Sequence, residues 1–145
     1  MTTTWTLTFD CASPALLAGF WKLALGYVDA APPVGFASWE DWLTHFDVPE
    51  DEWDDGAALE DPDGVRPKLS SLKVPEGKVA KNRLHVDLQV SGGRHRPHEE
   101  RLVRITETVE RLESAGASVI REDASEGQLD HVVMADPEGN EFCVV

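Results

Sequence analysis

The sequence predicts an α+β fold made of two copies of one strand–helix–strand unit. Two helical patterns each follow an alternating, strand-like segment, and they end at Gly26 and Gly116. Two turns of the form Asp-Pro-acidic-Gly, at residues 61–64 and 136–139, each precede a final strand. Because repeats of one supersecondary unit commonly share a core, we expect a curved, mostly antiparallel sheet with the helices on its convex side.

The first half begins with a strand over residues 6–11, where apolar and polar side chains alternate. Ser13 is a helix N-cap with Pro14 at the first helical position, and Gly26 suits a left-handed cap. The helix is apolar around most of its circumference, so we expect it to be well buried. One face carries Leu16, Phe20 and Leu23, and another carries Leu17, Trp21 and Leu25.

The rest of the first half is expected to hold short elements. A strand over residues 27–37 is interrupted by two prolines, and Ser38 caps a short helix over residues 39–46. A helical turn at residues 50–54 and strands at 57–60 and 67–74 follow.

The second half opens with the most regular alternation of the chain, over residues 81–90, which indicates a strand with one apolar and one polar face. Its apolar face carries Leu84, Val86, Leu88 and Val90, and its polar face carries His85, Asp87 and Gln89. A helix over residues 97–115 follows, and strands are expected at 117–121, 130–135 and 141–145. The helix is expected to bury Leu102, Ile105, Val109 and Leu112.

We therefore expect a single domain over residues 1–145. Its first module covers about residues 1–77, with an inserted helical segment at about 38–55, and its second module covers about 78–145.

Composition excludes several classes of function. The chain has 145 residues, a formal net charge of −14 and no long apolar run. A strongly anionic surface repels nucleic acid and acidic lipid, so neither is expected as a partner. No signal peptide or membrane span is visible. The two cysteines read as reduced thiols, so we expect a cytoplasmic protein.

The polar strand face offers the best candidates for chemistry. His85 is either a hydrogen-bonded strand residue or a general acid or base, since its reference pKa lies near neutral pH. Asp87 or Asp10 could orient it. Cys143 is a weak candidate nucleophile because no basic neighbour in the sequence lowers its pKa. His131 is interpreted as structural.

The inserted segment carries Trp39, Trp42, Phe46 and Trp53. The first three have helical spacing, so core packing is the simple interpretation. The alternative is a wall for a flat apolar ligand, because aromatic rings line many small-molecule pockets. The acidic residues around them are interpreted as a solvated surface. The loop at residues 94–98 either receives an anion or is only solvated.

The order of elements, the segment at residues 81–87 and the ending Asp-Pro-Glu-Gly-Asn-Glu-Phe-Cys at 136–143 resemble the glyoxalase/bleomycin-resistance/extradiol-dioxygenase superfamily, also called vicinal oxygen chelate. The resemblance implies paired βαβββ modules, a cleft in the sheet and a homodimer. It covers nearly the whole chain. Family members include isomerases, lyases, dioxygenases and proteins that sequester drugs.

The family's metal positions fall on Thr6, on His85, near residues 68–70 and on Cys143, and only His85 is a good family-type ligand. We therefore expect no tightly bound metal; if a divalent ion is present, His85, Glu141 and Cys143 are its expected ligands.

The expected function is binding of a small, partly apolar molecule, with lyase or isomerase chemistry at His85 and Asp87. The alternative is a non-catalytic binder of the bleomycin-resistance type. The expected ligand contacts are Asp10, Gln89, Trp39, Trp42, Glu141 and Cys143.

Overall fold

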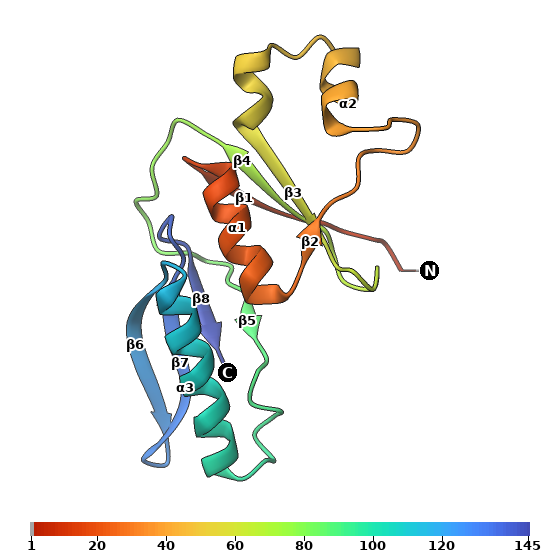
Figure 1. Ribbon diagram of the computed structural model, residues 1–145. Helices are drawn as coiled ribbons and strands as arrows, with labels where there is room; N and C mark the ends of the chain where they lie inside the picture. The colour runs from red at the N-terminus through yellow and green to blue at the C-terminus, as the bar shows by residue number, and fades with distance from the viewer. Residues whose placement is uncertain (1) are drawn as a thin grey trace. The chain divides into compact units, whose positions relative to one another are not determined.

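The computed structural model describes residues 2–145, and the chain divides into two compact units between Gly77 and Lys78. Each unit is one βαβββ module with its own four-stranded sheet (Figure 1). In each sheet the module's first strand pairs in parallel with its last strand, and the other two pairings are antiparallel. The prediction of an α+β protein with two such modules is confirmed.

The first unit has the strand order β1-β4-β3-β2. Its elements are β1 (Leu7–Cys11), α1 (Pro14–Leu25), β2 (Val28–Asp29), α2 (Trp39–His45), the 3₁₀ helix η1 (Glu50–Asp55), β3 (Gly56–Glu60) and β4 (Leu69–Lys73). One face of this sheet packs on α1, where Phe9 stacks on Trp21 with ring centroids 5.1 Å apart. Leu59 and Leu69 complete that buried face, so the opposite face is left to α2 and η1.

Helix α1 is buried on one side only. Leu17, Phe20 and Trp21 are buried, whereas Leu16 and Leu23 are 56% and 45% exposed, so the prediction of burial around most of the circumference was wrong. A single sheet face covers only one stripe of a helix, because side chains at i, i+3 and i+4 share a face. The helix ends as predicted, with Gly26 at φ 70° and its N–H bonded to the carbonyl of Lys22.

The segment after α1 is less regular than its sequence indicated. β2 stops at Asp29, and no strand continues across residues 30–37. Pro32 and Pro33 have no N–H to donate to a ladder, which explains the early end. Ser38 caps α2 as predicted, its hydroxyl accepting from the N–H of Asp41 at 3.0 Å.

The second unit has the strand order β5-β8-β7-β6. Its elements are β5 (Asp87–Leu88), α3 (His98–Ser114), β6 (Ser118–Ser125), β7 (Gln128–Ala135) and β8 (Glu141–Val144). Its core lies between α3 and the sheet and is formed by Leu88, Ile105, Leu112, Val132, Met134, Phe142 and Val144.

The strand predicted over residues 81–90 is mostly absent. Only Asp87 and Leu88 pair with β8, and Leu84 is 83% exposed. The parallel register sets His85 opposite Glu141, the first residue of β8, so β8 offers no backbone to residues 81–84. The alternation in the sequence was correct for Leu88, which is buried, but did not determine the length of pairing.

Helix α3 buries Ile105 and Leu112 as predicted, but Leu102 and Val109 are not among its buried residues. Its buried residues are Arg101, Ile105, Thr108 and Leu112, while Leu102 is 38% exposed. Arg101 lies inside because its guanidinium bonds the carboxylate of Asp130, an interaction that apolar periodicity cannot reveal.

The β6–β7 hairpin is longer than the strands predicted at 117–121 and 130–135. Glu126 and Gly127 both have positive φ, 53° and 76°, in a two-residue turn whose twist matches that of paired strands. Among the described residues, no helix is both long and apolar enough to cross a bilayer.

Candidate functional site

The first unit holds a cavity of about 560 Å³ that we call the tryptophan pocket. It lies on the sheet face opposite α1, and its walls come from α2, η1 and the segment beside them, which Figure 1 shows at one end of β3. The walls are Trp39, Trp42, Leu43 and Trp53. The volume lies in the range of pockets that bind small organic molecules.

The floor of the tryptophan pocket is made mostly of small side chains, with Leu72 of β4 beside them. Thr8, Gly56, Ala58 and Ser70 line it, and their register places them side by side on neighbouring strands. Because Gly56 has no side chain and Ala58 has only a methyl group, the sheet surface stays open beneath the indoles. Without such small residues, side chains from β3 would fill the space between sheet and helix.

The three indoles are held in place without being part of the core. Helix α2 contributes no buried residue, and Trp39 is 36% exposed. The Trp39 indole N–H donates to the carbonyl of Ala30 at 2.8 Å, and the Trp53 indole N–H donates to that of Val48 at 3.0 Å. Trp39 and Trp42 meet edge to face at 5.8 Å. Two of the three rings are therefore fixed by hydrogen bonds, and Trp42 is fixed by its contacts with Trp39 and Phe46.

The charged residues that line this pocket are all acidic. Its lining includes Asp29 and Glu52 but no lysine, arginine or histidine. Asp29 is paired with Lys22. Glu52 is exposed and has no ion pair among residues 2–145.

The second unit holds a separate cavity of about 410 Å³, which we call the His85 cavity. It is lined by His85, Asp87, Gln89, Ser91, Gly93, Arg94, His131, Cys143 and Val145. The β5–β8 pairing sets Asp87 opposite Cys143, so the short ladder itself brings these two side chains together.

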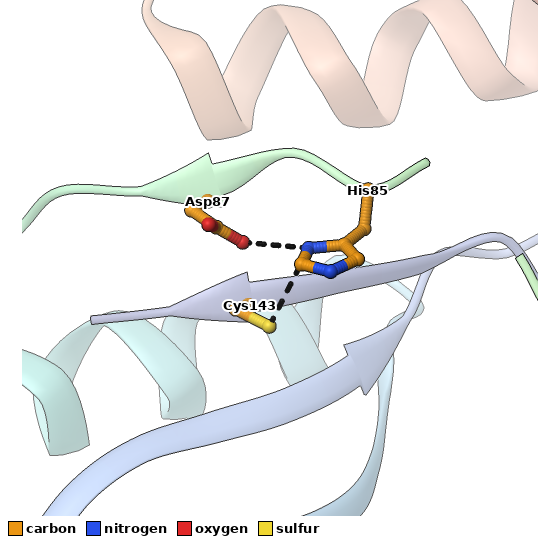
Figure 2. A group of neighbouring side chains, drawn as sticks. All are labelled: His85, Asp87 and Cys143. Carbon is orange, nitrogen blue, oxygen red and sulfur yellow. Dashed lines mark hydrogen bonds and ion pairs between the residues drawn. The ribbon is translucent and has the colours of Figure 1, made fainter. Parts of the chain in front are cut away.

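His85, Asp87 and Cys143 form a compact group in this cavity (Figure 2). The Nδ1 atom of His85 lies 2.7 Å from Oδ1 of Asp87 and 3.9 Å from Sγ of Cys143. Figure 2 shows both interactions ending on the same imidazole ring, which projects from the segment just before β5. The contact with Asp87 fixes the ring and favours a proton on Nδ1, which leaves Nε2 as the acceptor.

The Cys143 thiol is held in its neutral form in the metal-free protein. Burial raises its pKa to about 11, and the negative charge of Asp87 acts in the same direction. A neutral thiol is a poor nucleophile. The arrangement therefore does not support Cys143 as a nucleophile at neutral pH.

Glu141 and Gln89 occupy different places around this group. Glu141 accepts a hydrogen bond from the backbone N–H of Asn82 at 2.6 Å and lies 3.8 Å from the ammonium of Lys81. Its carboxylate therefore ties down the segment before β5, and it is Asp87 that stands beside His85. Gln89 lines the His85 cavity.

The donor set fits a divalent ion of the zinc type. His85, Asp87 and Cys143 each offer one ligand atom, and these atoms lie within 4.8 Å of one another. Three protein ligands with an open position are typical of catalytic zinc sites, and a thiolate favours zinc over magnesium or manganese. A bound ion would supply Lewis acidity.

A buried ionic network adjoins the His85 cavity and was not foreseen. Arg94 makes two hydrogen bonds to the Asp130 carboxylate, at 2.8 and 2.7 Å, and buried Arg101 adds a third at 3.2 Å. These bonds, first of all those from Arg94, hold the pKa of Asp130 well below its usual range. Since the Arg94 guanidinium is already paired, the structure favours a structural role for it over anion binding.

His131 belongs to the same network. Its Nδ1 lies 3.0 Å from Asp130 and its Nε2 lies 3.1 Å from Asp123, so both ring nitrogens are engaged. This arrangement agrees with the structural interpretation made from the sequence.

A third cavity, of about 760 Å³, is formed by residues 3–6 and 60–68 of the first unit. Its central carboxylate, Asp61, accepts from the backbone N–H groups of Asp63, Val65 and Arg66. Asp136 does the same for Glu138 and Asn140 in the second unit. Because Asp61 stabilises its turn in the same way as Asp136 does, we assign no binding role to this cavity.

The predicted site residues thus fall into two groups. The first unit contains Asp10, Trp39 and Trp42, and the second contains His85, Asp87, Gln89, Glu141 and Cys143. Asp10 is exposed on β1 and lines none of the three cavities. That the two groups face one ligand stays a prediction. Sequence reasoning missed the pocket floor, although the small residues at 56–58 were a signal for it.

Comparison with known proteins agrees with this architecture. The family model of the glyoxalase-like domain matches residues 6–145. No curated protein matches the chain in sequence.

Solved structures share the fold at low identity. A possible glyoxalase from Bacillus cereus is 16% identical, with a TM-score of 0.58 over 100% of this chain and 99% of its own. The fosfomycin resistance protein FosX from Mesorhizobium loti is 8% identical, with a TM-score of 0.62 over 99% and 90%. FosX from Listeria monocytogenes, solved with Mn(II) and a dihydroxypropylphosphonic acid, is 11% identical, with a TM-score of 0.60 over 99% and 89%. With the family model covering nearly its whole length, this chain belongs to the glyoxalase-like domain family, as its sequence predicted.

Proposed function

We propose that this protein binds a small, partly apolar organic molecule in the tryptophan pocket. The observation that carries the proposal is a wall of three indoles over a floor of mostly small side chains. Trp39 and Trp53 are anchored by their indole N–H groups, and Trp42 is held between the rings of Trp39 and Phe46. Aromatic rings that are held in place and only partly buried lose little entropy when a ligand covers them. They also leave apolar surface exposed to water, which a ligand would cover at a gain in free energy.

The chain offers an internal control for testing this proposal. Its five tryptophans are Trp5, Trp21, Trp39, Trp42 and Trp53. Trp21 is fully buried against β1 and Trp5 is 65% exposed outside the pocket. In ¹⁵N-labelled protein, flat aromatic probes should shift the indole N–H signals of the three pocket tryptophans and leave those of Trp5 and Trp21 in place. No shift of the three pocket signals with any probe would refute the proposal.

The geometry of His85 favours a second candidate function, a lyase or isomerase centre in the His85 cavity. The hydrogen bond that Nδ1 of His85 donates to Asp87 orients the imidazole, and Nε2 has no protein partner among residues 2–145. An oriented imidazole with one unengaged nitrogen can accept a proton from a bound carbon acid and return it to another atom. Acid–base steps of this kind typically contribute about 10²–10⁴-fold to a rate.

The test is solvent deuterium incorporation into a panel of small oxygenated carbon acids. Wild-type protein should exchange a proton next to a carbonyl, and His85→Ala should lose this activity by about 10²-fold or more. His131→Ala is the control, because its ring lines the same cavity with both nitrogens bonded. Equal exchange by wild type and His85→Ala would remove His85 from any mechanism.

The homodimer expected from the family and the cytoplasmic location both stay predictions. Analytical ultracentrifugation of the full chain tests the first, and fractionation of the source cells tests the second.

A further inference from the structure

We infer that the ligand of the tryptophan pocket is an organic cation, a flat apolar body that carries a protonated amine or quaternary ammonium group. This inference rests on the proposed function, and it specifies the chemical class of the molecule bound at that site. It follows from two independent features of the first unit, the aromatic lining and the sign of the surrounding charge.

The aromatic lining selects for cations over neutral molecules. The face of an indole is the best of the protein π-systems for attracting a positive charge within about 6 Å of the ring centre. Three indoles line this cavity, and Trp39 and Trp42 stand edge to face at 5.8 Å, so their faces point in different directions. Neighbouring rings at such angles can contact one cationic group from more than one side.

The charge around the pocket acts in the same direction. Residues 23–65 include twelve acidic side chains and no lysine or arginine. Four of the twelve are ion-paired with Lys22, Arg66, Lys68 and Lys73, which lie outside this stretch, so eight are left. The segments that wall the pocket, α2 and η1, lie within this stretch. The summed field of such a region raises the local concentration of cations and disfavours anions, most strongly at low ionic strength.

One carboxylate is placed to contact the ligand. Glu52 lines the pocket from η1, and it has no ion-pair partner among the described residues. Asp29, the other acidic lining residue, is neutralised by Lys22. We therefore expect Glu52 to be the counter-charge of the ligand, with Trp39, Trp42 and Trp53 holding its apolar body.

The experiment compares two probes that share one flat skeleton and differ in charge. Thioflavin T is a cationic benzothiazolium dye, and its N-demethylated benzothiazole counterpart is neutral. Dissociation constants come from fluorescence titration of the full chain, and the indole N–H signals report which tryptophans are contacted. We expect thioflavin T to bind about ten-fold more tightly than the neutral counterpart, and this ratio to fall as salt is added.

A matched pair of variants locates the charge effect. Glu52→Gln should weaken thioflavin T binding about three-fold and leave the neutral probe unchanged. Glu50→Gln makes the same substitution on the same 3₁₀ helix, at an exposed position outside the pocket, and should change neither value. An unchanged Trp21 signal shows that each variant is folded.

The outcomes separate the two proposals. Equal affinity for the cationic and neutral probes, or equal effects of Glu52→Gln and Glu50→Gln, would overturn the cation inference while leaving small-molecule binding in place. If neither probe nor any other aromatic compound shifts the Trp39, Trp42 and Trp53 signals, the proposed function fails and the inference fails with it.

Discussion

Replacing Asp130 by asparagine should destabilise the second unit more than any other single charge removal near the His85 cavity. Asp130 is 8% exposed and accepts hydrogen bonds from Arg94, Arg101 and His131. Asparagine keeps one acceptor oxygen but removes the negative charge, so the buried Arg101 guanidinium loses its counter-charge. Removing one partner of a buried ion pair costs about 3–5 kcal/mol. Because Arg94 is 69% exposed and can be solvated instead, we expect about 2–3 kcal/mol of lost stability.

This loss corresponds to a fall in melting temperature of about 5–10 °C for a domain of this size. All five tryptophans lie in the first unit, so tryptophan fluorescence is blind to the second. The assay is therefore differential scanning calorimetry combined with amide hydrogen exchange in β7. Asp123→Asn is the control, because Asp123 is also ion-paired but its side chain is 36% exposed, and we expect it to cost less than about 1 kcal/mol.

The same variant has a predicted pH dependence. The pKa of Asp130 is lower in the folded protein than in the unfolded chain, where it is about 3.9. The contribution of Asp130 to stability is therefore complete above the unfolded-state pKa and is lost as the pH falls through the folded-state pKa. The stability difference between wild type and Asp130→Asn should therefore be constant from about pH 6 to 8 and shrink below about pH 4. A difference that matches that of Asp123→Asn, or one that grows in acid, would refute the reasoning.

Three further outcomes follow from other contacts. In metal-free protein, the rate at which iodoacetamide alkylates Cys143 should be half-maximal near pH 11, and Asp87→Asn should lower that midpoint. Peptide mass spectrometry would measure both midpoints, and a wild-type midpoint near pH 8.5 would contradict the burial argument. Addition of Co²⁺ should produce a thiolate-to-cobalt absorption band that Cys143→Ser abolishes, whereas a band that persists in Cys143→Ser would place the metal elsewhere. Trp21→Ala should cost about 3–5 kcal/mol in urea unfolding, because Trp21 is fully buried, while Trp5→Ala should stay within about 0.5 kcal/mol; similar costs for the two would show that the α1 face is not the core of the first unit.

Local signals in the sequence predicted the architecture well. Gly26, Ser38 and the turns at 61–64 and 136–139 act through their own backbone neighbourhood, so their roles follow from residue type and position. Features that depend on distant partners were predicted less well. The alternation at residues 81–90 could not show that β8 offers pairing only from Glu141 onward.

The same distinction holds for the candidate site. His85 and Asp87 are two residues apart on one strand face, so their proximity could be expected from the strand period. The burial of Arg101 could not, because it requires Asp130 from a strand 29 residues later in the chain. The tryptophans of α2 fit the periodicity of a core helix, but α2 buries none of them because it covers a sheet face with a small-residue floor.

The strand ladders of the two modules are each complete within their own unit. At the parallel pairing of opening and closing strands, the first module has Thr8 beside Ser70, where the second has Asp87 beside Cys143. A substitution at one of these two positions leaves the backbone pairing at the other unchanged. In a duplicated fold of this kind, one module can bind a molecule while the other carries reactive groups. Either module can therefore be redesigned separately.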